Sequence, residues 1–125
     1  MKNEEKTSTN VTVEPNNIHH VLLNLGVASH LSGYTYIVQS LELVLIDPDL
    51  LHHVTKGLYI DVAKKYGVKP ANVERAIRHA ISTTWTYGNM DFINSVFRNS
   101  VRPDKGAPTN TMFLSRLYYY LNGVI

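Results

Sequence analysis

Cysteine is absent from the 125 residues of the sequence, which excludes a disulfide framework and thiolate chemistry. Long apolar runs are absent too. None approaches the roughly 20 residues that a membrane-spanning helix needs, and the N-terminus lacks the apolar core of a signal peptide. We therefore expect a cytoplasmic protein without a membrane partner.

The residue clusters that carry catalysis or bind metals are also missing. The sequence has neither a phosphate-cradling Gly-rich loop nor a Gly-x-Ser-x-Gly elbow. The six histidines include the pairs His19-His20 and His52-His53, but adjacent residues on a helix point about 100° apart. No His-x-x-x-His spacing occurs. The sequence predicts no enzyme, no cofactor and no metal site.

The length and composition predict one small globular domain. A chain of 125 residues with 44% hydrophobic residues can form a single core. The net charge of +2 permits nucleic-acid binding without requiring it, so the placement of the charges matters more than their sum. Residues 1–14 are polar with mixed charges, and we expect a disordered arm or linker there, followed by a helical domain over residues 15–122.

The most informative stretch runs from Pro70 to Tyr87. At the helical period its apolar side chains gather on one side and long polar side chains on the other, with Pro70 suited to the first turn and Gly88 to the residue past the end. The first set is Val73, Ile77, Ala80 and Thr84, flanked by Ala76 and Ile81, and the second is Arg75, Arg78, His79 and Ser82. The only acid is Glu74. Such a face suits the base edges and phosphates of a DNA major groove, although a merely solvated basic face would look the same.

A shorter amphipathic segment precedes this helix. Leu58 to Tyr66 places Asp61, Lys64 and Lys65 outward, Thr55 is a candidate cap before it, and Gly67 is suited to end it. A short helix, a turn that contains glycine, and a longer helix with a basic polar face form the helix-turn-helix pattern.

The remaining segments predict further helices and no strand. We expect helices over Pro15–Leu25, Gly33–Ile46 with Ser32 as cap, and Asp91–Phe97, a short helical turn over Pro48–Val54, and a last helix capped by Thr109 or Asn110. The expected fold class is all-α, with about six helices that include a helix-turn-helix unit.

Several stretches resemble one known family. Val73 to Ile81 resembles the recognition helix in the C-terminal effector domain of the sporulation-initiation master response regulators of endospore-forming bacteria. Other stretches that resemble this domain are Leu58-Tyr59, Asp61 to Tyr66, Gly33-Tyr34, the junction from Trp85 to Asn89, and Lys105 with Pro108-Thr109-Asn110. The resemblance extends over roughly residues 17–121. It implies an all-helical, sequence-specific DNA-binding transcription regulator that binds short promoter boxes, often as tandem copies.

This resemblance and side-chain chemistry together predict a set of DNA contacts. Arg75 suits a guanine edge and Glu74 a cytosine amino group, and Asn72 stands where a family member carries a base-contacting arginine. We expect Asn72, Glu74 and Arg75 to read bases, and Lys64, Lys65, Arg78, His79 and Lys105 to contact phosphates. The expected partner is double-stranded DNA of the nucleoid, bound in the major groove by a homodimer or tandem copies, with RNA polymerase as a further partner.

A second function stays open from the sequence. The same fold could act as a protein-interaction module that pairs with a full-length response regulator through the tyrosine-rich segment Tyr118-Tyr119-Tyr120. Whether the chain is a domain cut from a longer protein or a natural stand-alone version is also open. The intact polar face of the 70–87 helix favours DNA binding, because a module released from DNA has no reason to keep it.

Overall fold

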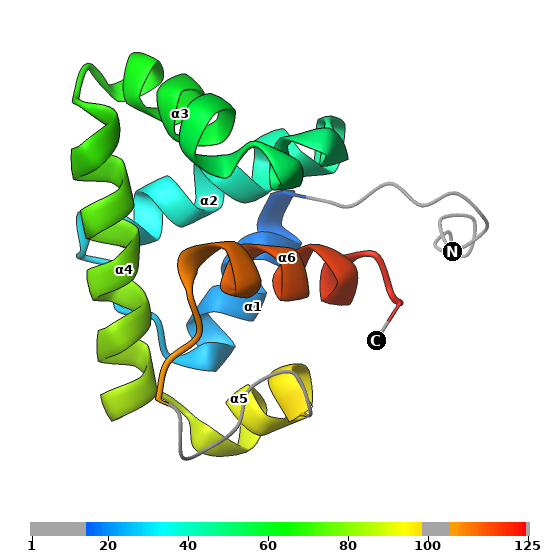
Figure 1. Cartoon of the computed structure of the whole chain (residues 1–125). Helices are drawn as coiled ribbons and strands as arrows, with labels where there is room; N and C mark the ends of the chain where they lie inside the picture. The colour runs from blue at the N-terminus through cyan, green and yellow to red at the C-terminus, as the bar shows by residue number, and fades with distance from the viewer. Residues whose placement is uncertain (1–14, 99–105, 125) are drawn as a thin grey trace.

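The computed structural model describes residues 15–98 and 106–124, and within these ranges the chain is helical with no strand (Figure 1). The elements in chain order are α1 (Pro15–Leu25), α2 (Ser32–Ile46), the 3₁₀ turn η2 (Pro48–His52), the π-helical turn η3 (Val54–Leu58), α3 (Tyr59–Tyr66), α4 (Pro70–Tyr87), α5 (Met90–Phe97) and α6 (Asn110–Leu121). The expected all-α fold is confirmed. The predicted arm over residues 1–14 and Lys105 lie outside the described residues. None of the described helices is both long and apolar enough to cross a membrane.

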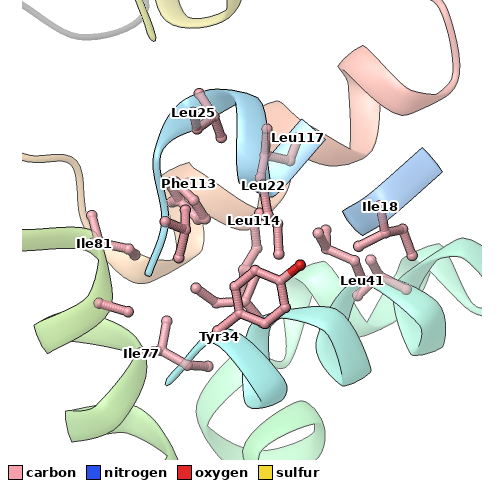
Figure 2. Close-up of a cluster of buried hydrophobic side chains, with 14 of the residues drawn as sticks. Ile18, Leu22, Leu25, Tyr34, Leu41, Ile77, Ile81, Phe113, Leu114 and Leu117 are labelled. Atoms are coloured by element: carbon pink, nitrogen blue, oxygen red, sulfur yellow. The ribbon is translucent and has the colours of Figure 1, made fainter. Parts of the chain in front are cut away.

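The core lies where α1, α2, α4 and α6 meet, and Figure 2 shows the side chains that fill it. Each helix contributes residues at the helical spacing that are almost completely buried: Ile18, Leu22 and Leu25 of α1, Ile37 and Leu41 of α2, Ile77 and Ile81 of α4, and Phe113, Leu114 and Leu117 of α6. Burying one such side chain stabilises the fold by about 1.5–3 kcal/mol. The core therefore holds one whole face of α4 and leaves the opposite face to solvent.

Gly33 allows α2 to approach α4 very closely. A Cβ atom at this position would stand 2.2 Å from the Ala76 carbonyl oxygen and 2.8 Å from the Ala80 Cβ atom, far inside van der Waals contact. The missing side chain, rather than an unusual backbone angle, is what the crossing requires. The position of α4 thus depends on a residue with no side chain.

The far end of α4 is held by a pair of glycines, Gly26 and Gly88. Gly88 has an extended backbone, with φ −79° and ψ −172°, and a Cβ atom there would stand 2.5 Å from the carbonyl oxygens of Leu25 and Thr84. A Cβ atom on Gly26 would in turn stand 2.7 Å from the Gly88 Cα atom, and the Asn89 N–H donates to the Leu25 carbonyl at 3.0 Å. The end of α1 is therefore packed directly against the junction of α4 and α5.

Three predicted helix starts were wrong by one residue, and the first of these is α5, which begins at Met90 rather than Asp91. Ser32 is the first residue of α2 rather than its cap, because the Tyr34 N–H already bonds to the Leu31 carbonyl at 3.0 Å. The helix predicted from Leu58 begins at Tyr59, and Thr55 does not cap it. The π-helical turn η3 runs directly into α3, and the Tyr59 N–H bonds to the Val54 carbonyl, so no side-chain cap is needed there.

Candidate nucleic-acid interface

A sharp turn of the chain joins α3 to α4 (Figure 1). Gly67 follows α3 in the left-handed conformation with φ +67°, and the Val68 N–H closes the turn on the Ala63 carbonyl at 3.1 Å. Glycine adopts this conformation without steric cost, which is why the predicted stop at Gly67 is confirmed. Three residues, 67–69, then separate α3 from the start of α4 at Pro70.

The face of α4 opposite the core carries the predicted DNA-contacting residues. Asn72, Arg75, Arg78 and His79 are exposed, and Glu74 is half-buried. The buried side of the same helix consists of Val73, Ile77, Ala80, Ile81 and Thr84, as the periodicity predicts. Figure 1 shows α4 along one side of the molecule, where its outer face meets no other described element. We call Asn72, Glu74, Arg75, Arg78 and His79 the reading surface.

Two hydrogen bonds order the reading surface. Arg75 donates from Nη2 to Oδ1 of Asn72 at 2.8 Å, and Arg78 donates from Nη1 to Oε2 of Glu74 at 2.6 Å. Exposed pairs three or four residues apart on a helix stabilise it by only about 0.2–0.5 kcal/mol. Their effect is mainly geometric, because each holds a guanidinium group in line with the helix face. Arg75 keeps its remaining N–H groups for an outside acceptor.

The back of this unit is held by a buried asparagine. Asn110, the first residue of α6, donates from Nδ2 to the Tyr59 hydroxyl of α3 at 2.9 Å and to the Glu74 carbonyl of α4 at 3.0 Å. Burial raises the pKa of Tyr59 above 10.0; the Asn110 hydrogen bond lowers it, nearby Glu74 raises it and Arg78 lowers it. The Tyr59 hydroxyl therefore stays protonated and keeps both its donor and its acceptor roles at neutral pH.

The two predicted phosphate-binding lysines of α3 differ. Both are exposed, but Lys65 donates from Nζ to Oε1 of Gln39 on α2 at 2.9 Å and stands 5.8 Å from the Tyr66 ring centroid. Lys65 thus links α3 to α2, whereas Lys64 is exposed in the last turn of α3.

The structure brings together on one helix the predicted residues Asn72, Glu74, Arg75, Arg78 and His79, with Lys64 and Lys65 on the preceding helix. Sequence reasoning missed the structural parts played by Gln39 and Asn110. Asn110 was a candidate cap of α6, but Thr109 is the cap, since its hydroxyl accepts from the Met112 N–H at 3.2 Å. Two adjacent polar residues stand at the start of α6, and only one of them can be its cap. This was the available signal that the other, Asn110, bonds elsewhere.

A short helix, a three-residue turn and a longer helix with an exposed basic face, set in an all-helical core, define the helix-turn-helix class of DNA-binding protein. The comparison with known families agrees with this class. The family model described as Sporulation initiation factor Spo0A C terminal matches residues 18–121.

The chain belongs to that family, and the resemblance inferred from the sequence is confirmed. It is the effector type of domain, a helical DNA-binding transcriptional regulator of sporulation and not an enzyme.

Proposed function

We propose that α4 enters the major groove of promoter DNA and that the N-terminal half of its reading surface reads the bases. The observation that carries this proposal is the exposed Arg75 guanidinium, held along the helix face by Asn72 at 2.8 Å. An arginine in the first half of a recognition helix can form a bidentate contact with O6 and N7 of guanine. Glu74 would accept from a cytosine amino group on the opposite strand once its bond to Arg78 is released.

Asn72 is included in the base-reading set with a narrower role. Its side chain is short, and its Oδ1 atom accepts from Arg75 with one lone pair, so the second lone pair and the Nδ2 group remain for a base. An asparagine in this position favours adenine over guanine when it reaches a base edge. We therefore propose a binding site related to those of the family, with a different preference at the base beneath Asn72.

The phosphate contacts follow from the exposed cations around the reading surface. We propose that Lys64, Arg78 and His79 contact phosphates directly. Lys65 would join them only after exchanging its bond to Gln39, and Lys105 is proposed on the family resemblance alone. These contacts position the helix and contribute little to the choice of sequence.

The proposal is tested by comparing Arg75→Ala with Lys56→Ala. Lys56 lies on η3, at the end of α3 away from α4, so its loss is a control for the removal of one positive charge (Figure 1). On a duplex selected by the wild-type protein, Arg75→Ala should cost roughly 1–3 kcal/mol in fluorescence anisotropy titrations and relax the preference at one base pair. An equal loss on selected and random duplexes would instead make Arg75 a phosphate contact.

We also propose that two copies bind adjacent boxes, and that the bound protein contacts RNA polymerase. Both proposals are supported by the family resemblance. Tandem binding predicts a second shifted band, with cooperative affinity, on a duplex with two boxes in electrophoretic mobility assays. Contact with RNA polymerase predicts that purified protein changes run-off transcription from such a promoter. The location that we propose with these partners is the nucleoid in the cytoplasm.

A further inference from the structure

Asn110 uses one amide group to connect the two helices of the helix-turn-helix unit. Its side chain is 8% exposed, and its Nδ2 group donates to Tyr59 of α3 at 2.9 Å and to the Glu74 carbonyl of α4 at 3.0 Å. A carboxamide nitrogen has two hydrogens, so each helix receives one of them. One side chain of α6 therefore ties α3 to α4.

The contact on α4 lies at a particular residue. Glu74 is the half-buried position whose side chain joins the reading surface, and Arg75 follows it directly. A helix carbonyl has a second lone pair beyond the one used within the helix, so Glu74 can accept from Asn110 without breaking α4. The bond therefore holds α4 from behind at the turn that would enter the groove.

Capping of α6 does not explain Asn110. The cap of α6 is Thr109, whose hydroxyl accepts from the Met112 N–H at 3.2 Å. The Asn110 side chain turns away from its own helix, and its Nδ2 group bonds to α3 and α4 instead. Its role is therefore separable from the stability of the α6 N-terminus.

We propose that Asn110 is a positioning residue that fixes α4 relative to α3 and so aims Glu74 and Arg75 at the bases. This inference rests on the proposed function, because it assumes that these two side chains read DNA. Useful hydrogen bonds span only about 2.7–3.2 Å, so a shift of about half an ångström at Glu74 is enough to weaken a base contact. Phosphate contacts by long, flexible cations tolerate such a shift better. Loss of Asn110 should thus reduce discrimination more than overall affinity.

The test measures the ratio of affinities for a selected duplex and a scrambled duplex of the same length at one salt concentration. Asn110→Ala should lower this ratio about tenfold, the equivalent of one weakened base contact. Thr109→Ala is the matched control, since it removes the neighbouring cap, lowers the denaturation midpoint and should leave the ratio unchanged. Tyr59→Phe removes one hydroxyl, keeps the fold and should lower the ratio by about threefold.

Tyr59→Phe carries the test if Asn110→Ala does not fold. Equal losses on both duplexes for Asn110→Ala, or an unchanged ratio for Tyr59→Phe, would overturn the positioning role. The positioning role also fails if Thr109→Ala lowers the ratio as much as Asn110→Ala does, because general destabilisation then explains the result. A wild-type protein that fails to discriminate between the two duplexes defeats the proposed function itself, a result distinct from the failure of Asn110 alone.

Discussion

The two halves of α4 differ in what surrounds them. The first half, residues 70–79, carries the exposed reading surface and is held from behind at Glu74 by Asn110. The second half, residues 80–87, lies outside the reading surface, and its inner side packs against aromatic rings from other helices. Trp85 meets the rings of Phe97 and Phe113 with centroids 5.0 and 6.1 Å away, and Thr84 is buried and bonds to the Ala80 carbonyl at 2.7 Å.

The difference shows how one helix serves two purposes. The free energy that holds α4 in place comes from its buried side, which includes Val73 and Ile77 in the first half and Ala80, Ile81 and Thr84 in the second. The first half can therefore keep charged, exposed side chains whose own contribution to stability is small. Substitutions on the buried side of either half should destabilise the fold, whereas substitutions of the exposed side chains in the first half should change the DNA contacts while the fold persists.

The largest effect is expected from Phe113→Ala. Phe113 is completely buried and stacks on Phe97 with centroids 5.6 Å apart, so its truncation should lower the free energy of unfolding by about 3–5 kcal/mol. Urea denaturation followed by circular dichroism measures this. The neighbouring Met112 is 44% exposed, and Met112→Ala should change the stability by no more than about 0.5 kcal/mol. Similar losses for the two variants would contradict the burial assigned to α6.

The next largest effect is expected from Gly33→Ala, which should disturb both halves of α4. The added Cβ atom would collide with the Ala76 carbonyl, so α2 and α4 must separate, at a cost of about 1–3 kcal/mol. DNA affinity should fall as well, because Ala76 follows the base-reading residues directly. Gly57→Ala is the control: its Cβ atom would meet only side chains at 3.3 and 3.4 Å. If Gly33→Ala keeps wild-type stability, the close crossing is not a constraint on the fold.

A smaller effect should separate Lys64 from Lys65. Removing Lys64 should reduce the slope of log affinity against log salt by about one, the change expected for one lost phosphate contact. Removing Lys65 should change the slope less, because its Nζ already bonds to Gln39. Anisotropy titrations at several salt concentrations measure both. Equal slopes for the two variants would mean that Lys65 exchanges Gln39 for a phosphate on binding.

The smallest and most local effect concerns Asn72. Asn72→Arg should restore a guanine preference at one base, whereas Asn72→Ala should relax that position and also release Arg75. Binding selection on a randomised duplex shows both changes at single-base resolution. A wild-type preference for guanine as strong as that of Asn72→Arg would show that another residue reads this base. Neither substitution should alter the unfolding free energy by more than about 0.5 kcal/mol, since the position is exposed.

Much of the fold could be predicted from the sequence because proline and glycine mark its boundaries. The limits of α1 and α4 agree with the prediction to the residue, since Gly26 follows the first and Pro70 and Gly88 bracket the second. The start of α3 could not be predicted in the same way. The π-helical turn η3 has no specific sequence signal, and it removes the need for the cap that Thr55 was expected to provide.

The candidate site was predictable in its members but not in its connections. Periodicity places Arg75 and Arg78 on the exposed face of α4, and the structure agrees. The bonds of Lys65 to Gln39 and of Asn110 to Glu74 join residues 26 and 36 positions apart, so they depend on tertiary packing that no local pattern encodes. The roles of the individual residues on DNA remain predictions.

The packing of Gly26 against Gly88 also has a consequence for the exchange of amide hydrogens with solvent. The Asn89 N–H donates to the Leu25 carbonyl across this contact, and the Gly88 N–H bonds to Thr84 at 2.7 Å. The Asn89 bond cannot open unless α1 moves away from the junction of α4 and α5, so this amide should exchange with deuterium only when the two separate. Amides near the start of α4, such as that of Asn72, require no such separation and should exchange earlier. The junction that follows the recognition helix should then exchange more slowly than the start of that helix.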